Sequence, residues 1–123
     1  MKDLNDNIII VKSMNFAVRV VKLAKFLREK HEYDLASQVL RSGTSIGANA
    51  REALRGQSRA DFHAKMSISL READETNYWL ELLFRSEYIS DKEYTSLNTD
   101  CDELCKLLMS IVKSTTKENS RKP

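Results

Sequence analysis

The chain has 123 residues, enough for one domain with a single core, and a net charge of +2. Only three residues are glycine, one is proline and 31% are charged, which favours long helices and leaves a sheet-rich fold without its turn residues. No apolar run approaches the roughly 18 residues of a membrane span, so we expect a cytoplasmic protein that has neither a membrane anchor nor a secretory signal.

Residues 1–12 are expected to form a flexible arm, and the first predicted helix covers residues 13–30. Val18, Val21 and Phe26 fall outside the main apolar stripe of this helix, which indicates that it is covered on more than one side. The stripe itself is predicted from apolar residues at helical spacing, namely Phe16, Val20, Leu23 and Leu27.

The second predicted helix covers residues 35–55, with Asp34 as its N-cap. Gly43 and Gly47 have the spacing of a close helix contact, and each mid-helix glycine costs about 1 kcal/mol relative to alanine. Tight packing would offset that cost; the alternative is a bend or break between Ser42 and Gly47. The predicted inward line is Leu35, Val39, Ser42, Ile46, Ala50 and Ala53.

The third predicted helix covers residues 59–88 and begins after a capping pair, Ser58 and Asp61. Its predicted core line is Phe62, Met66, Leu70, Ala73, Asn77, Leu80 and Phe84. A second apolar arc lies on another side of the helix. Since one core needs only one stripe, this arc predicts burial against another subunit. The predicted interface residues are Ile68, Trp79, Leu82 and Leu83.

The fourth predicted helix covers residues 91–112 and starts with a capping box formed by Ser90 and Glu93. Its apolar stripe is Tyr94, Leu97, Cys101, Leu104, Leu108 and Ile111. Residues 114–123 are expected to be a disordered polar tail. Three short connections between four helices predict an all-α, antiparallel up-down-up-down four-helix bundle over residues 13–113.

The sequence contains no recognisable catalytic machinery. Cys101 and Cys105 lie on the apolar side of the fourth predicted helix, which indicates small core residues. Carboxylate bundles that bind two metal ions use Glu-x-x-His pairs, and neither histidine follows a glutamate at that spacing. We therefore expect a non-enzyme that has no metal ion and no cofactor.

A polar seam runs beside the core line of the third predicted helix. It consists of Ser69, Thr76 and Asn77, and buried hydroxyls and amides require hydrogen-bond partners. Two interpretations are open: hydrogen bonds to the second helix across the glycine contact, or a ligand pocket.

Charge is distributed unevenly along the chain: residues 1–60 have a balance of +5 and residues 61–123 a balance of −3. The excess positive charge indicates a surface for a polyanion, a surface that pairs with acidic helices of a neighbouring subunit, or an ordinary solvated face. Aromatic residues do not alternate with the basic ones, so nucleic-acid contact would go to the backbone and be independent of sequence. The candidate phosphate-contacting residues are Arg19, Lys22, Lys25, Arg51, Arg55 and Arg59.

Several blocks of sequence together resemble the 23S rRNA intervening-sequence protein family over residues 12–113. The blocks are Arg41-Ser42-Gly43-Thr44-Ser45-Ile46-Gly47-Ala48-Asn49, Glu52-Ala53, Ser58 through Phe62, Lys65-Met66-Ser67-Ile68, and Glu72-Ala73-Asp74-Glu75-Thr76-Asn77-Tyr78-Trp79-Leu80. The resemblance implies a four-helix bundle that assembles into a ring-like homopentamer. It also implies similarity to the accessory variability protein of diversity-generating retroelements, a pentameric barrel that binds nucleic acid and a reverse transcriptase. It implies no catalytic residues.

Two functions are consistent with these observations. The first is a non-enzymatic oligomeric scaffold that contacts structured RNA or DNA through its basic surface. Its further partners would be copies of itself and a reverse transcriptase or other neighbour-encoded protein. The alternative is a protein–protein interaction adaptor that pairs with a neighbour-encoded partner and makes no nucleic-acid contact.

Overall fold

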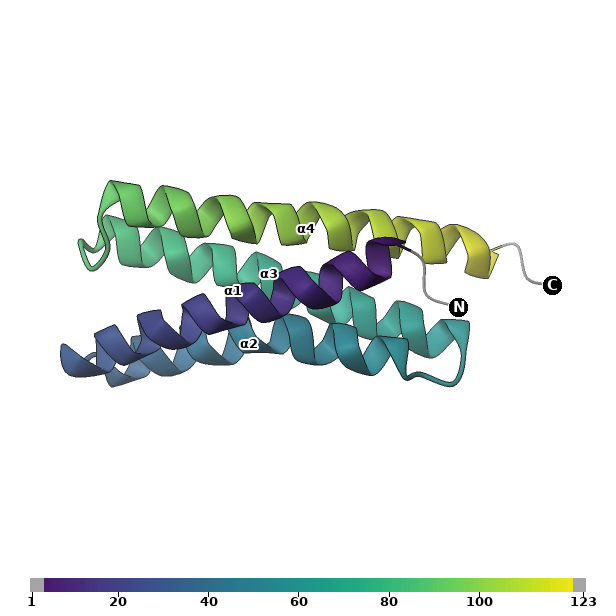
Figure 1. Cartoon of the computed structure of the whole chain (residues 1–123), viewed down its shortest axis with the longest axis horizontal. Helices are drawn as coiled ribbons and strands as arrows, with labels where there is room; N and C mark the ends of the chain where they lie inside the picture. The colour runs from purple at the N-terminus through teal and green to yellow at the C-terminus, as the bar shows by residue number, and fades with distance from the viewer. Residues whose placement is uncertain (1–3, 121–123) are drawn as a thin grey trace.

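The computed structural model describes residues 4–120, with side chains described for residues 7–116. This part of the chain is entirely helical apart from short connections, so the prediction of an all-α fold with four helices is confirmed. In Figure 1 the helices lie lengthwise beside one another and the chain reverses at each connection. None of the described helices is long and apolar enough to cross a membrane. The helices are α1 (Leu4–Glu29), α2 (Tyr33–Leu54), α3 (Arg59–Arg85) and α4 (Asp91–Ser120).

The helices contact one another in a closed circuit. Within the described residues, the contacting pairs are α1–α2, α2–α3, α3–α4 and α1–α4, and the last is the least extensive. Because α1 and α3 make no direct contact there, they occupy opposite corners of the bundle, and so do α2 and α4. The outward side of α1 therefore points away from the outward side of α3.

The first helix begins earlier than predicted, at Leu4, so the expected arm is wrong for residues 4–12. Ile9 and Ser13 are buried and extend the inward stripe by two helical turns. The serine hid this pattern, because a polar residue interrupts the apolar repeat. Its hydroxyl donates a hydrogen bond to the Ile10 carbonyl (3.3 Å), which makes its burial tolerable. Residues 1–3 of the expected arm lie outside the described residues.

The last helix also runs beyond its predicted end and reaches Ser120, so the expected tail is wrong for residues 114–120. Thr115 continues the inward stripe one turn beyond Ile111 and is buried. Its hydroxyl lies 3.1 Å from the Ile111 carbonyl oxygen and 2.7 Å from Nδ1 of His63 on α3. These partners satisfy a polar group that a purely apolar periodicity would place in solvent. Residues 121–123 lie outside the described part.

Close packing, and not a bend, explains the two glycines of α2, which is one continuous helix. A Cβ atom at Gly43 would lie 2.7 Å from both methyl groups of Val20, and one at Gly47 would lie 2.9 Å from the hydroxyl of Ser13. Both neighbours belong to α1. The missing Cβ atoms therefore let α1 and α2 approach closely.

The inward face of α3 differs from the predicted one by a rotation of less than one residue, since Met66, Ala73 and Leu80 are buried as predicted. The structure buries Ser69, Thr76 and Leu83, whereas Leu70, Asn77 and Phe84 from the predicted core line are only half-buried. The predicted line took large apolar residues as inward, but two of the buried positions carry hydroxyls that form hydrogen bonds with α2. The helix also ends at Arg85, three residues before its predicted end, and Glu87 in the following turn has a positive φ of 66°.

The buried hydroxyls of α3 form hydrogen bonds with α2, as one interpretation of the polar seam predicts. Ser69 donates to the Ile46 carbonyl (2.7 Å), and the Thr76 hydroxyl lies 2.9 Å from that of Ser42. These bonds lie on the α3 side of α2, away from the glycines, so their predicted route across the glycine contact is wrong. Asn77, the third member of the seam, instead donates to Asp102 on α4 (3.1 Å).

Candidate nucleic-acid interface

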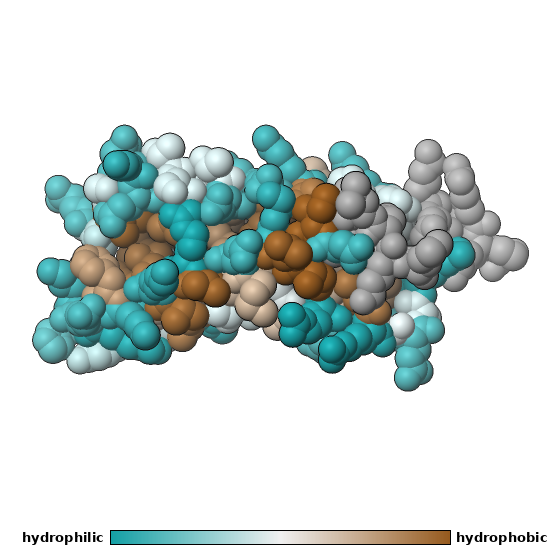
Figure 2. Space-filling view, viewed as in Figure 1, coloured by the Kyte–Doolittle hydropathy of each residue, from teal (hydrophilic) through white to brown (hydrophobic). Residues whose placement is uncertain are grey.

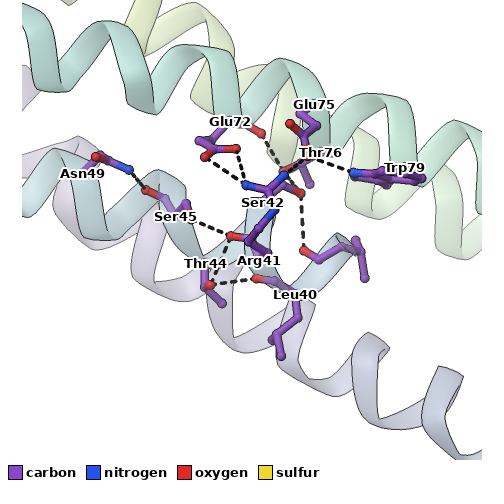
Figure 3. Close-up of polar contacts among 11 residues, drawn as sticks. Leu40, Arg41, Ser42, Thr44, Ser45, Asn49, Glu72, Glu75, Thr76 and Trp79 are labelled. Carbon is purple, nitrogen blue, oxygen red and sulfur yellow. Dashed lines mark hydrogen bonds and ion pairs between the residues drawn. The ribbon is translucent and has the colours of Figure 1, made fainter. Parts of the chain in front are cut away.

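An ion-pair cluster ties α2 to α3 on the surface above the buried hydroxyls (Figure 3). Arg41 lies 3.2 Å from both carboxylate oxygens of Glu72 and also donates to Glu75. The indole N–H of Trp79 donates to the same carboxylate of Glu75 (3.2 Å). Glu72, Glu75 and Trp79 of the Glu72–Leu80 block thus have a structural role, because their contacts with Arg41 and with one another hold two helices together.

Of the six basic residues proposed for nucleic-acid contact, one is already engaged with another helix of the same protomer. Arg19 on α1 donates to the Asp100 carboxylate (2.6 Å) and to the Ser96 hydroxyl (2.9 Å), both on α4. The same α1–α4 seam contains an ion pair between Lys12 and Glu103 (3.1 Å). Arg19 thus serves first as a contact between helices, and most of its donors are already used.

The other five residues are exposed, but they lie in two groups. Since Gly43 packs on Val20 and Gly47 on Ser13, Arg51 lies level with the start of α1, whereas Lys22 lies level with residues near 41 of α2. At a rise of about 1.5 Å per residue, about 15 Å along the bundle separates these two levels. The structure therefore brings the basic residues of α2 and α3 together and leaves Lys22 and Lys25 in the other half of the molecule.

The group at the α2–α3 connection consists of Arg51, Arg55 and Arg59. Every residue from Arg55 to Asp61 is exposed, so the connection is open to a large ligand. The Ser58 hydroxyl accepts a hydrogen bond from the Asp61 N–H (3.1 Å) and caps α3, as predicted. Glu52, an acidic residue inside the group, is paired with Lys65 of α3 (3.4 Å), which reduces its effect on the arginines. We call these three residues the arginine cluster.

A groove of about 480 Å³ lies between α1 and α2 beside the arginine cluster. Ile10 and Met14 of α1 line it on one side, and Arg51 of α2 and the C-cap residue Arg55 line it on the other. Sequence reasoning did not anticipate this groove. Gly47 and Ala48, two small residues of α2, also line it.

The predicted interface arc on α3 is only partly on the outside. Leu83 is 1% exposed and belongs to the protomer's own core, so its assignment to an interface is wrong. It follows the buried Leu80 by three residues and Thr76 by seven, which places all three on one side of the helix. Trp79 is half-buried and packs against the core, whereas Ile68 and Leu82 are half-buried on the outward side.

Another apolar surface lies on α1, where Val18, Val21 and Phe26 fall outside the predicted stripe. Val11 is 59% exposed and Met14 and Val18 are each 49% exposed. Hydrophobic residues are visible along the face on which α1 runs in Figure 2. We define the outer α1 face by four residues at a 3-4-3 spacing: Val11, Met14, Val18 and Val21.

The two cysteines are buried between α3 and α4, as predicted. The hydrogen bond with Cys105, together with burial, raises the pKa of the Cys101 thiol, so this group stays protonated at neutral pH. The Cys101 thiol lies 3.3 Å from the Ala73 carbonyl oxygen. Among the described side chains, no three His, Cys, Asp or Glu residues come together in a way that would hold a metal ion.

Comparison with known proteins finds one matching family and a solved structure with the same fold. Residues 5–110 match the sequence profile of the 23S rRNA-intervening sequence protein family. A crystal structure of a protein of unknown function from the S23 ribosomal protein family of Bacteroides thetaiotaomicron superimposes with a TM-score of 0.87 at 57% identity. The alignment covers 89% of this chain and 99% of that chain. No curated protein matches this chain.

Proposed function

We propose, from the premise that the chain belongs to the 23S rRNA-intervening sequence protein family, that it is a non-enzymatic scaffold. In this proposal the protein assembles from copies of itself and binds structured RNA or DNA through the arginine cluster. The resemblance of the sequence to the family implies such a function, and the positions of the basic residues support the arginine cluster as the part that would perform it.

The observation that carries the proposal is the position of the arginine cluster. Arg51 lies in the last turn of α2, Arg55 is the C-cap residue just after it, and Arg59 is the first residue of α3 across an exposed connection. The ion pairs found between described side chains use other basic residues, including Arg19 and Arg41. Guanidinium groups make bidentate contacts with phosphate and need no base-specific geometry, which fits contact with a nucleic-acid backbone.

Assembly would strengthen a site that is weak in one copy. Three arginines per protomer provide little affinity alone, and the whole chain has a net charge of only +2. In a ring-like homopentamer, which the family resemblance implies, several clusters would meet the same nucleic acid, and linked contacts raise the effective concentration of each further contact. We therefore expect binding to depend on assembly.

A mobility-shift titration against a mixture of structured RNAs tests the site. The variant R51A/R55A/R59A removes the arginine cluster. The matched control K22A/K25A/R28A removes three exposed charges from the C-terminal half of α1, away from the cluster. We expect only the first variant to lose binding. The slope of log affinity against log salt should fall by about 1 for each arginine that contacts a phosphate.

Equal loss of affinity in both variants would show that net charge matters and the cluster does not. If wild-type protein bound no nucleic acid near physiological salt, but retained one polypeptide from its genomic neighbourhood after nuclease treatment, the alternative of a protein adaptor would replace this proposal. A measured catalytic activity or a stoichiometric metal ion in purified protein would contradict the non-enzymatic part.

A further inference from the structure

We propose that copies of this chain join head to tail, with the outer α1 face of one copy packed against the outward side of α3 in the next copy. The inference rests on the proposed self-assembly and names the two surfaces that would make the junction. It keeps Ile68 and Leu82 of the predicted α3 arc and adds the outer α1 face as the surface that the neighbouring copy presents.

The outer α1 face has the pattern of a helix that packs on two sides. Its four residues lie on the side opposite the stripe that includes Ile9 and Val20, both completely buried. Three of the four expose about half or more of their surface. A 3-4-3 spacing of apolar residues over three turns is the pattern of a helix seam. Their exposure in the monomer therefore calls for a covering element.

The outward side of α3 presents a second apolar surface. Tyr78 is 59% exposed, and its ring meets that of Trp79 edge to face, with 5.0 Å between centroids. Since the Trp79 indole is held by Glu75, the tyrosine has a fixed support. Ile68 and Leu82 are half-buried and about four helical turns apart on the same side. We call Ile68, Tyr78 and Leu82 the outer α3 face.

The positions of these two faces determine the type of contact. Because α1 and α3 occupy opposite corners of the bundle, the two faces point away from each other. One copy cannot cover its own second face. Two different surfaces on opposite sides of a protomer form a heterologous contact, which continues from copy to copy until the rotation closes a ring.

Charge favours this pairing over a contact between two α1 helices. α1 contains five Lys or Arg and two Asp or Glu, a balance of +3. α3 contains four and five, a balance of −1. Two α1 helices side by side would bring like charges together, whereas α1 against α3 would not. α4 is also acidic and, in its described part, exposes one large apolar residue strongly, Met109, as α3 exposes Tyr78. The half-buried Leu107 and Val112 of α4 pack against the protomer's own core, however, whereas Ile68 and Leu82 of α3 lie on its outward side, so α4 offers an α1 helix less to cover.

Two variants that each damage one face, V18D and Y78D, test the junction by sedimentation velocity. Both positions are exposed in the protomer, so the helical circular dichroism of each variant should be unchanged. We expect each variant alone to be a monomer. Mixed in equal amounts they should form a dimer and nothing larger, because the Y78D copy retains its α1 face and the V18D copy retains its α3 face. The control M109D, at an exposed apolar residue of α4, should assemble like wild type.

Each of the other possible outcomes contradicts a specific part of the proposal. If wild type is a monomer, the proposed self-assembly fails, and this inference fails with it. If wild type assembles but Y78D does so equally well, the α3 face is not in the junction; normal assembly of V18D excludes the α1 face in the same way. If both variants are monomers and the mixture yields no dimer, the two faces do not meet.

A cross-linking measurement provides a second check that does not depend on the strength of a single junction. Under oxidising conditions, the variant V18C/Y78C should form a ladder of disulfide-linked multimers, while V18C alone and Y78C alone should not form linked dimers. A linked dimer of V18C alone would indicate an α1–α1 contact and contradict the proposal. Cys101 and Cys105 are buried and should not contribute to the ladder.

Discussion

Helix α2 packs against two neighbours in two different ways. On its α1 side the contact is steric, since Gly43 and Gly47 lack the side chains that would hold the helices apart. On its α3 side the contact is polar, with buried hydroxyl hydrogen bonds below and the Arg41 ion pairs above (Figure 3). The glycine contact sets the distance between α1 and α2, and the polar contact sets the position of α3 along α2.

This difference has consequences for specificity. A steric contact excludes larger residues but gives only weak directional preference. A hydrogen bond such as that from Ser69 to the Ile46 carbonyl has a single correct partner, and a shift of α3 along α2 would leave it unmade at a cost of about 1–3 kcal/mol. The polar side therefore fixes α3 along α2, and the glycine side sets how close α1 comes.

The largest expected effect tests the steric side. In G43A the new methyl group would lie 2.7 Å from both Cγ atoms of Val20, and a β-branched side chain in a helix cannot rotate away. We expect a loss of about 1–3 kcal/mol in the free energy of unfolding, measured by urea denaturation. G47A is the matched control, because its nearest neighbour is the hydroxyl of Ser13, which can rotate.

A gain of up to about 1 kcal/mol from the better helix propensity of alanine should make G47A nearly neutral or stabilising. The double variant G43A/V20A should lose less than the sum of its two single variants, since removal of the valine methyls makes room for the new one. Equal behaviour of G43A and G47A would show that the contact with Val20 does not set the distance between α1 and α2.

A smaller effect is expected on the polar side. T76V keeps the shape of the side chain but removes a buried hydroxyl that lies 2.9 Å from Ser42 Oγ and 2.8 Å from the Glu72 carbonyl oxygen. We expect a loss of about 1–2 kcal/mol in urea denaturation. The control T99V removes an exposed hydroxyl that donates to Thr95 on α4, and should change stability by less than about 0.5 kcal/mol. Similar losses in both variants would contradict a role for the buried bond.

The contrast between the two sides of α2 also explains which parts of the fold could be predicted from the sequence. Four helices and most inward positions follow from apolar periodicity, and the close glycine contact follows from the cost of mid-helix glycine. The same periodicity fails where a hydroxyl lies in the core. Ser13 and Thr115 hid the true ends of α1 and α4, and Thr76 displaced Asn77 from the inward face of α3.

The candidate site was harder to predict for a different reason. Which basic residues come together depends on the register between helices, and that register is set by contacts distant in sequence, such as Gly43 with Val20. The sequence therefore identified Arg51, Arg55 and Arg59 together with residues that lie elsewhere or are already engaged, such as Arg19. Leu83 shows the same limit, because an error of less than one residue in the inward face decides whether it is core or interface.

The smallest expected effect separates the surface part of the polar contact from its buried part. R41M removes the charge that pairs with Glu72 and Glu75 but keeps an apolar stem over the helix contact. The arginine side chain is 49% exposed, so its ion pairs are largely solvated, and we expect a loss of at most about 1 kcal/mol. That loss should shrink as salt is raised to 1 M, because ions screen exposed pairs. The loss in T76V should not change with salt. If R41M were as costly as T76V and equally insensitive to salt, the ion pairs would contribute to the α2–α3 contact as strongly as the buried hydroxyls, and the register would be set at the surface as well as in the core.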